Sequence, residues 1–264
     1  MFPRLAVRSL ILLMLWGGVV SGGLEFRAQA DDWGEARRAG AFVFRADFPL
    51  RDEEQLLREM SQLGADLKQT LGIKLSPHNT EVLLFHNRAA YQKYLSIRVP
   101  EGVNRPALFV KTDELARVYA FRGPELSTHL RHEGTHALLH GSLKILPLWL
   151  DEGLAEYFEV PAEARPSENP HLRSIKWGAR LTWRPHLRNL AAKREMQEMG
   201  PKDYRDAWGV VHFLIHGPEP ARQILVEYLQ TIQKGEAPEP LEKQLEASLP
   251  GYEDRIAQHF RQWK

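Results

Sequence analysis

The sequence predicts an α+β fold, because strand-like segments gather in the first half of the chain and helical segments fill the second. Up to Gly123, short runs rich in apolar residues are bounded by glycine, proline or charged residues. Beyond Pro124, apolar residues recur at the spacing of three and four that is typical of helices. This segregation favours a small mixed sheet with helices, followed by a helical C-terminal lobe, over alternating βαβ units.

The first half is expected to hold four strands and two helices. Strand patterns bounded by turn residues occur at 40–48, 81–87, 106–112 and 116–123. A helix is expected at 50–72, where apolar residues recur every three or four positions and a glycine ends the pattern. A shorter helix is expected at 88–97.

The second half is expected to be all helical. Helical patterns occur at 125–140, 147–159, about 172–183, about 186–197, 202–216 and 219–233, with a final pair after Pro240. The loop at 161–171 is rich in proline and glutamate, so it is the expected boundary between two lobes. The sheet-bearing lobe would span 31–160, and the helical lobe 161–264.

Residues 1–30 have the layout of a secretory signal peptide. Arg4 and Arg8 precede an apolar run at 10–20, and small residues near Ala30 offer a cleavage site. The run is short for a membrane span, although an uncleaved N-terminal anchor is the alternative. We therefore expect a secreted or periplasmic protein with no stable membrane span after cleavage.

The composition limits the possible chemistry. A formal net charge of +1 over 264 residues gives no reason to expect a nucleic-acid partner. There is no cysteine, which excludes disulfides, thiolate metal sites and cysteine nucleophiles. Any metal site must be built from histidine, aspartate or glutamate.

The segment His132-Glu133-Gly134-Thr135-His136 matches the H-E-x-x-H pattern. Histidines at i and i+4 lie on one helical face, so their rings can converge on one Zn²⁺ ion. His129 and His140 lie near the same stripe, and we interpret both as structural rather than as ligands.

A catalytic zinc site uses three protein ligands, and Glu152 is the expected third. The break between the two helices allows the chain to reverse and to bring Glu152 toward the histidine pair. Asp151 is the chief alternative ligand. Gly134 and Gly153 have no side chains, so the two helix backbones could approach closely at these positions.

Two further glutamates have expected roles around the metal. Glu133 is expected to face the position of a zinc-activated water and to take its proton. Glu156 follows Glu152 by one turn and is expected to accept the free ring N–H of a ligating histidine.

These motifs resemble those of the gluzincin metallopeptidases, the zincin clan that includes thermolysin and aminopeptidase N. The likeness rests on "HEGTH" followed by "WLDEGLAEYF", and residues 80–216 are similar to peptidase-MA-like domains of secreted bacterial proteins. The resemblance implies a zincin-like fold, zinc ligands at His132, His136 and Glu152, and a catalytic base at Glu133. It does not imply which bond is cleaved.

Gluzincins also place a tyrosine or histidine from a later segment at the oxyanion. The predicted helix at 202–216 has Tyr204 and His212 on one face, and these are the candidates. The alternative is that both side chains only pack beneath the site.

The sequence therefore predicts a zinc metallopeptidase that acts on a peptide or protein, with a strand at 106–112 or 116–122 along the cleft. Two alternatives remain: a non-catalytic metal-binding scaffold, and a zinc amidase acting on cell-wall peptides. The oligomeric state is not predicted.

Overall fold

The computed structural model describes residue 33 and residues 35–77, 79–112 and 115–264. The expected signal peptide at 1–30 lies outside the described residues. In the described part of the chain, no helix is long and apolar enough to span a membrane.

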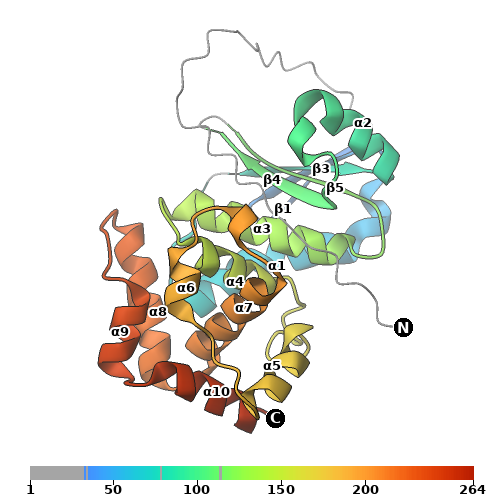
Figure 1. The fold of residues 1–264 in the computed structure, drawn as a ribbon. Helices are drawn as coiled ribbons and strands as arrows, with labels where there is room; N and C mark the ends of the chain where they lie inside the picture. The colour runs from blue at the N-terminus through green and yellow to red at the C-terminus, as the bar shows by residue number, and fades with distance from the viewer. Residues whose placement is uncertain (1–32, 34, 78, 113–114) are drawn as a thin grey trace.

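A mixed five-stranded sheet forms the N-terminal part of the molecule (Figure 1). Its strands are β1 (Glu35–Ala39), β2 (Phe42–Ala46), β3 (Thr80–Phe85), β4 (Ala107–Lys111) and β5 (Ala116–Phe121). The order across the sheet is β1-β2-β3-β5-β4. The central pairs β2–β3 and β3–β5 are parallel, whereas β1 and β4 pair antiparallel at the two edges. Strand β4 is therefore an edge strand, and β5 is internal.

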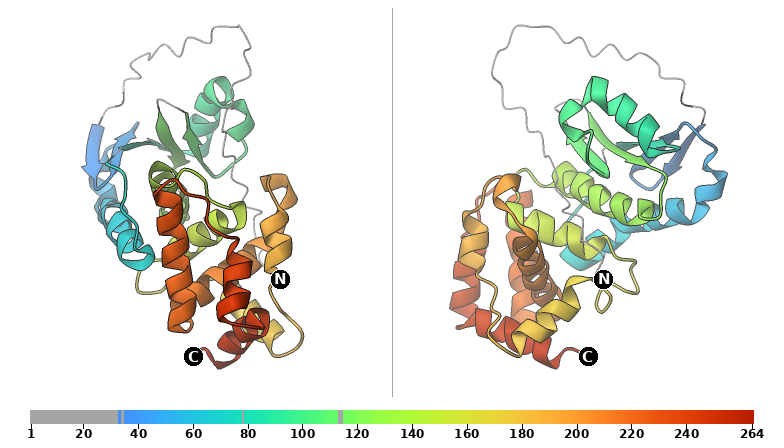
Figure 2. Two further views of the ribbon diagram at one scale, coloured as in Figure 1. Left: turned by 90° about the vertical axis from the view of Figure 1, so that its left-hand side faces the viewer. Right: turned by 45° about the vertical axis from the view of Figure 1, so that its right-hand side comes forward.

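Helices cover both faces of this sheet (Figures 1 and 2). On one face, α2 (Arg88–Arg98) packs a small apolar cluster that includes Tyr91 and Leu95. The other face contacts α1 (Glu54–Leu71) and α3 (Leu126–Ser142). In α1 the buried residues recur every three or four positions, which is the pattern that predicts this helix. The helix ends at Gly72, whose φ of 64° is the left-handed conformation that glycine adopts readily.

The rest of the chain is helical, with a 3₁₀ turn, η3 (Met196–Glu198). The helices are α4 (Leu148–Phe158), α5 (His171–Ala179), α6 (Leu187–Ala192), α7 (Pro201–His216), α8 (Glu219–Gln233), α9 (Leu241–Ser248) and α10 (Tyr252–Gln262). Helices α5 and α6 are shorter than the sequence predicts. The chain leaves α5 in a turn in which the Trp183 amide donates to the Gly178 carbonyl, and after α6 it is extended at Lys193.

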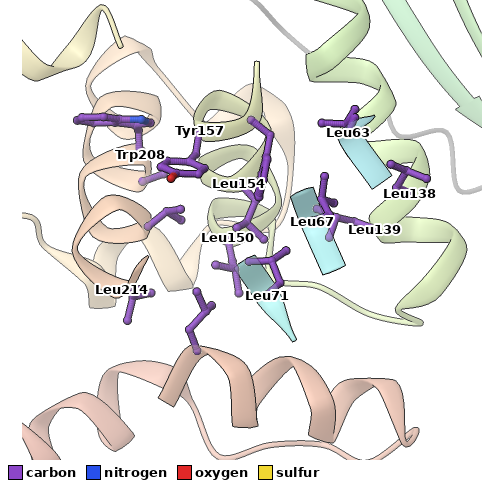
Figure 3. Packing of buried hydrophobic residues seen from close by; sticks show 14 of the residues in the cluster. Leu63, Leu67, Leu71, Leu138, Leu139, Leu150, Leu154, Tyr157, Trp208 and Leu214 are labelled. Carbon is purple, nitrogen blue, oxygen red and sulfur yellow. The ribbon is translucent and has the colours of Figure 1, made fainter. Parts of the chain in front are cut away.

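One continuous apolar core connects the sheet to the helical part. Figure 3 shows side chains of α1, α3, α4 and α7 meeting in this core, including Leu67, Leu139, Leu154 and Trp208. Helix α4 lies in the middle of this packing, and all of its residues except the first are buried. Fully burying each leucine side chain contributes roughly 1.5–3 kcal/mol, so the position of α4 is strongly determined.

Strand β1 is the one described strand that the sequence analysis omits. Its sequence EARRA carries three charged residues and has only its last residue fully buried. Edge strands with charged side chains lack the apolar alternation by which strands are recognised.

Candidate metal centre

Helices α3 and α4 bring His132, His136 and Glu152 together. The Nε2 atoms of the two histidines are 3.2 Å apart. Oε2 of Glu152 lies 3.8 Å from Nε2 of His132, and Oε1 lies 3.8 Å from Nε2 of His136. Two nitrogen ligands of one tetrahedral zinc ion are about 3.3 Å apart, so the histidine pair has the spacing of ligands to a common ion.

A carboxylate holds the other ring nitrogen of each histidine. Nδ1 of His132 lies 2.9 Å from Oε2 of Glu159, and Nδ1 of His136 lies 2.9 Å from Oδ1 of Asp151. An ionised carboxylate only accepts hydrogen bonds, so each neutral ring carries its proton on Nδ1. Both Nε2 lone pairs then face the space shared with Glu152. This is the orientation that metal-binding histidines need.

The role expected of Glu156, accepting the ring N–H of a ligating histidine, is filled for His132 by Glu159. Oε2 of Glu156 lies 3.3 Å from Nε2 of His171, and the hydrogen bond to His132 is made by Glu159. The sequence points to Glu156 because it follows Glu152 by one helical turn. The ring of His132 is instead reached from Glu159, the residue that ends α4.

Glu152 is the strongest sign that a cation belongs at this site. Its side chain is 1% exposed, and neither carboxylate oxygen has a hydrogen-bond partner among the described residues. Two carboxylate oxygens and two imidazole lone pairs therefore converge without a donor. Buried acceptors of this kind are costly unless a cation satisfies them. Two imidazoles and one carboxylate suit catalytic zinc.

Asp151, the alternative ligand, is already occupied. Its Oδ1 bonds to His136, and its Oδ2 lies 2.7 Å from Nε2 of His140. His136, His140 and Asp151 are also close enough to hold a metal ion, but they satisfy one another. The geometry therefore favours Glu152 over Asp151 as the third ligand.

The electrostatics of the centre favour positive charge. Burial would lower the pKa of both His132 and His136, but hydrogen bonds to Glu159 and Asp151 and nearby carboxylates raise both pKa values overall. Burial, together with nearby carboxylates, raises the pKa of Glu152 well above its usual range. Without a metal ion the centre would attract protons, and a divalent cation would replace them.

Glu133 lies beside the edge strand of the sheet. Its Oε2 accepts a hydrogen bond of 2.9 Å from the backbone amide of Phe109 in β4. The carboxylate is 7% exposed and belongs to the same helix as the two histidines. Of the two strands expected along the cleft, the edge strand β4 is the one that contacts the active helix through this bond.

Tyr204 lies near the candidate centre. Its hydroxyl is buried and has no hydrogen-bond partner in the described part of the chain. Burial, followed by the carboxylates of Glu152 and Glu156, raises the pKa of this hydroxyl. The phenol therefore stays protonated, as a hydrogen-bond donor must.

His212 does not have the predicted position. Its Nε2 lies 3.1 Å from the carbonyl oxygen of Pro166, and its Nδ1 lies 3.1 Å from Nε2 of His259. A carbonyl only accepts, so Nε2 donates to Pro166 and Nδ1 accepts from His259. Both ring nitrogens are therefore engaged by Pro166 and His259, which disfavours the expected oxyanion role of His212.

The two glycines of the motifs do not face each other across α3 and α4. A Cβ on Gly134 would meet Cε of Met60 at 2.7 Å, in α1. A Cβ on Gly153 would meet the carbonyl oxygen of Ala207 at 2.8 Å, in α7. The expected close approach of α3 and α4 at these glycines is therefore wrong, because Gly134 faces a side chain of α1 and Gly153 faces the backbone of α7.

Sequence reasoning missed two members of the network. No sequence pattern marked Glu159 as a partner of His132, because the contact between them depends on how α4 crosses α3. His140 follows His136 by four residues, and this spacing could have indicated that its ring lies on the same helix face as the histidine pair. His140 is buried and bonded to Asp151, whereas His129 lies 3.7 Å from Glu125, outside the centre.

Comparisons with known proteins give a likeness of fold. No protein-family model and no curated protein matches the sequence. The structure is similar to an M1 zinc metallopeptidase from Deinococcus radiodurans, with a TM-score of 0.50 and 18% identity over 86% of this chain and 50% of that one. A mutant M1 zinc metallopeptidase from the same organism gives a TM-score of 0.49 and 17% identity over 87% and 51%. This chain therefore spans about half the length of these neighbours.

Proposed function

We propose that the protein is a zinc-dependent hydrolase that cleaves peptide bonds. One observation carries this proposal: two Nε2 lone pairs and an unpartnered buried carboxylate, from His132, His136 and Glu152, converge on one point. The fold-level likeness to zinc metallopeptidases supports it.

The chain's own residues have separable roles in this proposal. His132, His136 and Glu152 would hold zinc. When bound, zinc polarises a carbonyl and lowers the pKa of water to about 7. Glu133 would take the proton of the attacking water and pass it to the leaving amine. The hydrogen bond from Phe109 keeps one oxygen of Glu133 fixed, which leaves the other for this proton.

Tyr204 and the edge strand complete the proposed site. The protonated hydroxyl of Tyr204 has no partner among the described residues, so it is available to donate to the oxyanion. Among the described residues, strand β4 pairs on one side only. The Phe109 amide is taken up by Glu133, so an extended peptide would pair with the other backbone groups of this edge.

The proposal is tested by two substitutions of glutamate that should fail differently. Glu133→Gln leaves the three ligands in place, so zinc should stay near one ion per chain while cleavage falls by several orders of magnitude. Glu152→Ala removes a ligand, so zinc should be held weakly and activity lost with it. The measurements are metal stoichiometry and cleavage of a mixed peptide library.

Two outcomes would contradict the assignment. Loss of zinc in Glu133→Gln, or full retention in Glu152→Ala, would show that the ligands are wrong. A wild-type protein that binds zinc but cleaves no member of a broad library would favour the metal-binding scaffold instead.

We also propose export with cleavage near Ala30, which rests on the sequence of residues 1–30 alone. Mass spectrometry of the exported protein should find an N-terminus near residue 31. An intact N-terminus on the exported chain would favour the anchor.

A further inference from the structure

Several of the buried polar groups that lack partners among the described residues belong to the candidate metal centre or interact electrostatically with it. In the described part of the chain these groups belong to Tyr91, Arg105, Glu152, Tyr204 and Trp208. Arg105 interacts electrostatically with Tyr91, Glu152 and Tyr204, and also with Glu133. Native proteins leave few buried polar groups unsatisfied, so a cluster of them indicates a site for something else.

Zinc would satisfy the acceptors of Glu152, but it cannot satisfy donors. The hydroxyl of Tyr204 is assigned above to the oxyanion. Three donors remain, the Tyr91 hydroxyl, the Trp208 indole and the Arg105 guanidinium, and only Arg105 among them is charged. Its Nη1 is buried and unbonded among the described residues. Its partner must be an acceptor, and a guanidinium favours a carboxylate, which it can bind through two parallel N–H groups.

Two buried arginines in the described chain have such partners within the protein, whereas Arg105 is half-buried with its Nη1 atom buried. Arg131 pairs with Glu59 and Arg165 pairs with Asp66, both through Nη1. The positive charge of Arg105 interacts with the carboxylates of Glu133 and Glu152 but forms no salt bridge with a described residue. A contribution to stability alone explains such a charge poorly.

The position of Arg105 relative to β4 suggests which part of a substrate it meets. Arg105 lies two residues before Ala107, where β4 begins (Figure 1). Antiparallel pairing is slightly more stable per residue than parallel pairing. A peptide bound antiparallel to β4 would have its C-terminal side near the beginning of the strand, beside Arg105.

We propose that Arg105 binds a carboxylate of the substrate, on the C-terminal side of the cleaved bond. This inference rests on the proposed peptidase function and deepens it. The carboxylate is either the free C-terminus of a short peptide or an acidic side chain. In the first case the protein removes residues from the C-terminal end of peptides.

The test measures binding without cleavage. Zinc-loaded Glu133→Gln protein is titrated calorimetrically with N-acetyl-trialanine bearing a free carboxylate, and with its C-terminal amide. A third and a fourth amidated peptide carry aspartate or asparagine as the last residue. We expect a preference of roughly 10- to 100-fold for a carboxylate over its neutral counterpart, which is the range for a charged hydrogen-bonded pair.

The two sources of the carboxylate are distinguished within this series. Preference for free trialanine over its amide indicates the C-terminus, and preference for aspartate over asparagine indicates a side chain. Either preference must vanish when Arg105→Met is added to the Glu133→Gln protein. Arg105→Lys should keep part of it, because the charge remains but the paired N–H groups are lost.

Lys111 provides a matched control at the other end of the same strand. Lys111→Met removes a positive charge from β4 but should retain the carboxylate preference. Equal binding of all four peptides, or a preference that survives Arg105→Met, would overturn the inference.

This outcome is separate from that of the proposed function. A wild-type protein that cleaves the library without a carboxylate preference keeps the function and refutes the role of Arg105. An Arg105-dependent preference in a protein that cleaves nothing supports the carboxylate site and refutes the peptidase.

Discussion

At the residue scale, the candidate metal centre depends on acids that are not themselves proposed as ligands. Glu159 fixes the ring of His132, and the buried Arg131 in turn contacts the backbone carbonyl of Glu159. Asp151 fixes the ring of His136 and is itself bonded to His140. Partners of this kind orient ligands and typically contribute 10- to 100-fold to metal affinity or activity.

Glu159→Ala should therefore weaken zinc binding by about 10- to 100-fold, because the ring of His132 loses its orienting carboxylate. Competition with a chromogenic chelator measures the affinity. Glu156→Ala is the matched control on the same helix and should have a smaller effect. A larger loss in Glu156→Ala would mean that the hydrogen bond between His132 and Glu159 is unimportant for the metal.

Tyr204→Phe tests the remaining oxyanion candidate. Removing only the hydroxyl should lower kcat by about 10²-fold or more, with KM and zinc content nearly unchanged. Steady-state kinetics on a peptide from the library would measure this. Unchanged kcat would show that the oxyanion donor lies elsewhere.

Single residues could be predicted wherever local periodicity determines their position. His132 and His136 are one helical turn apart, so their shared face follows from the sequence. Glu159 and Arg105 reach the centre only through the crossing of α4 over α3 and the path of the chain before β4. No local spacing in the sequence encodes such contacts. His212 shows a different limit, because it shares a helix face with Tyr204 in the sequence pattern but contacts other partners in the structure.

At the element scale, the contact between α4 and α7 positions the proposed ligand Glu152 relative to Tyr204. Gly153, next to that ligand, faces the backbone carbonyl of Ala207 and a methyl group of Val211. The two helices approach closely because no side chain separates them at this point.

Gly153→Ala should push α4 and α7 apart, since a Cβ would lie 2.8 Å from the carbonyl oxygen of Ala207. We expect a loss of about 1–3 kcal/mol in the free energy of unfolding, measured by urea denaturation, and a lower kcat. Gly141→Ala in α3 is the control, because its Cβ would meet nothing closer than 4.0 Å. This control should be neutral or stabilising by up to about 1 kcal/mol. Equal stability of the two variants would contradict the close-contact explanation.

Most elements could be predicted because their apolar residues follow a single period. The six buried positions of α1 and its terminal Gly72 are an example. The pattern fails where tertiary contacts replace it. Strand β1 is held by pairing with β2 rather than by apolar alternation, and the end of α5 is set by a turn around Trp183.

At the scale of the whole molecule, the C-terminal helix α10 is joined to α7 and α4 through a cluster of buried and half-buried histidines. His259 of α10 donates to His212 of α7, and the ring of His259 also packs against Trp263. His216, next in this cluster, lies 2.8 Å from the hydroxyl of Tyr157 in α4. These rings are neutral when the chain is folded.

Stability should consequently fall in mild acid. Burial lowers the pKa of His212 to about 3 and that of His259 to about 4, against 6.5 for an ordinary histidine. As the pH falls below 6.5 the unfolded chain takes up these protons first, so their contribution is complete above pH 6.5 and is lost toward pH 4 and below. Urea denaturation at pH 7, 6, 5 and 4 would measure the decline.

His259→Gln keeps an N–H donor but removes one titrating group, so its stability should depend less on pH over the same range. An unchanged pH dependence in this variant would show that the cluster does not cause the decline. The sequence contains all three histidines on predicted helices, but it does not reveal that α7 and α10 meet there.

The hydrogen bond from Phe109 to Glu133 has a consequence for how the protein tolerates mutation. The donor is a backbone amide, which every residue except proline possesses. Amino-acid substitution at position 109 is therefore limited by the packing of its ring against His140, not by the anchoring of the proposed catalytic base. A lineage of such proteins could vary this residue among apolar types and retain the geometry of the base throughout.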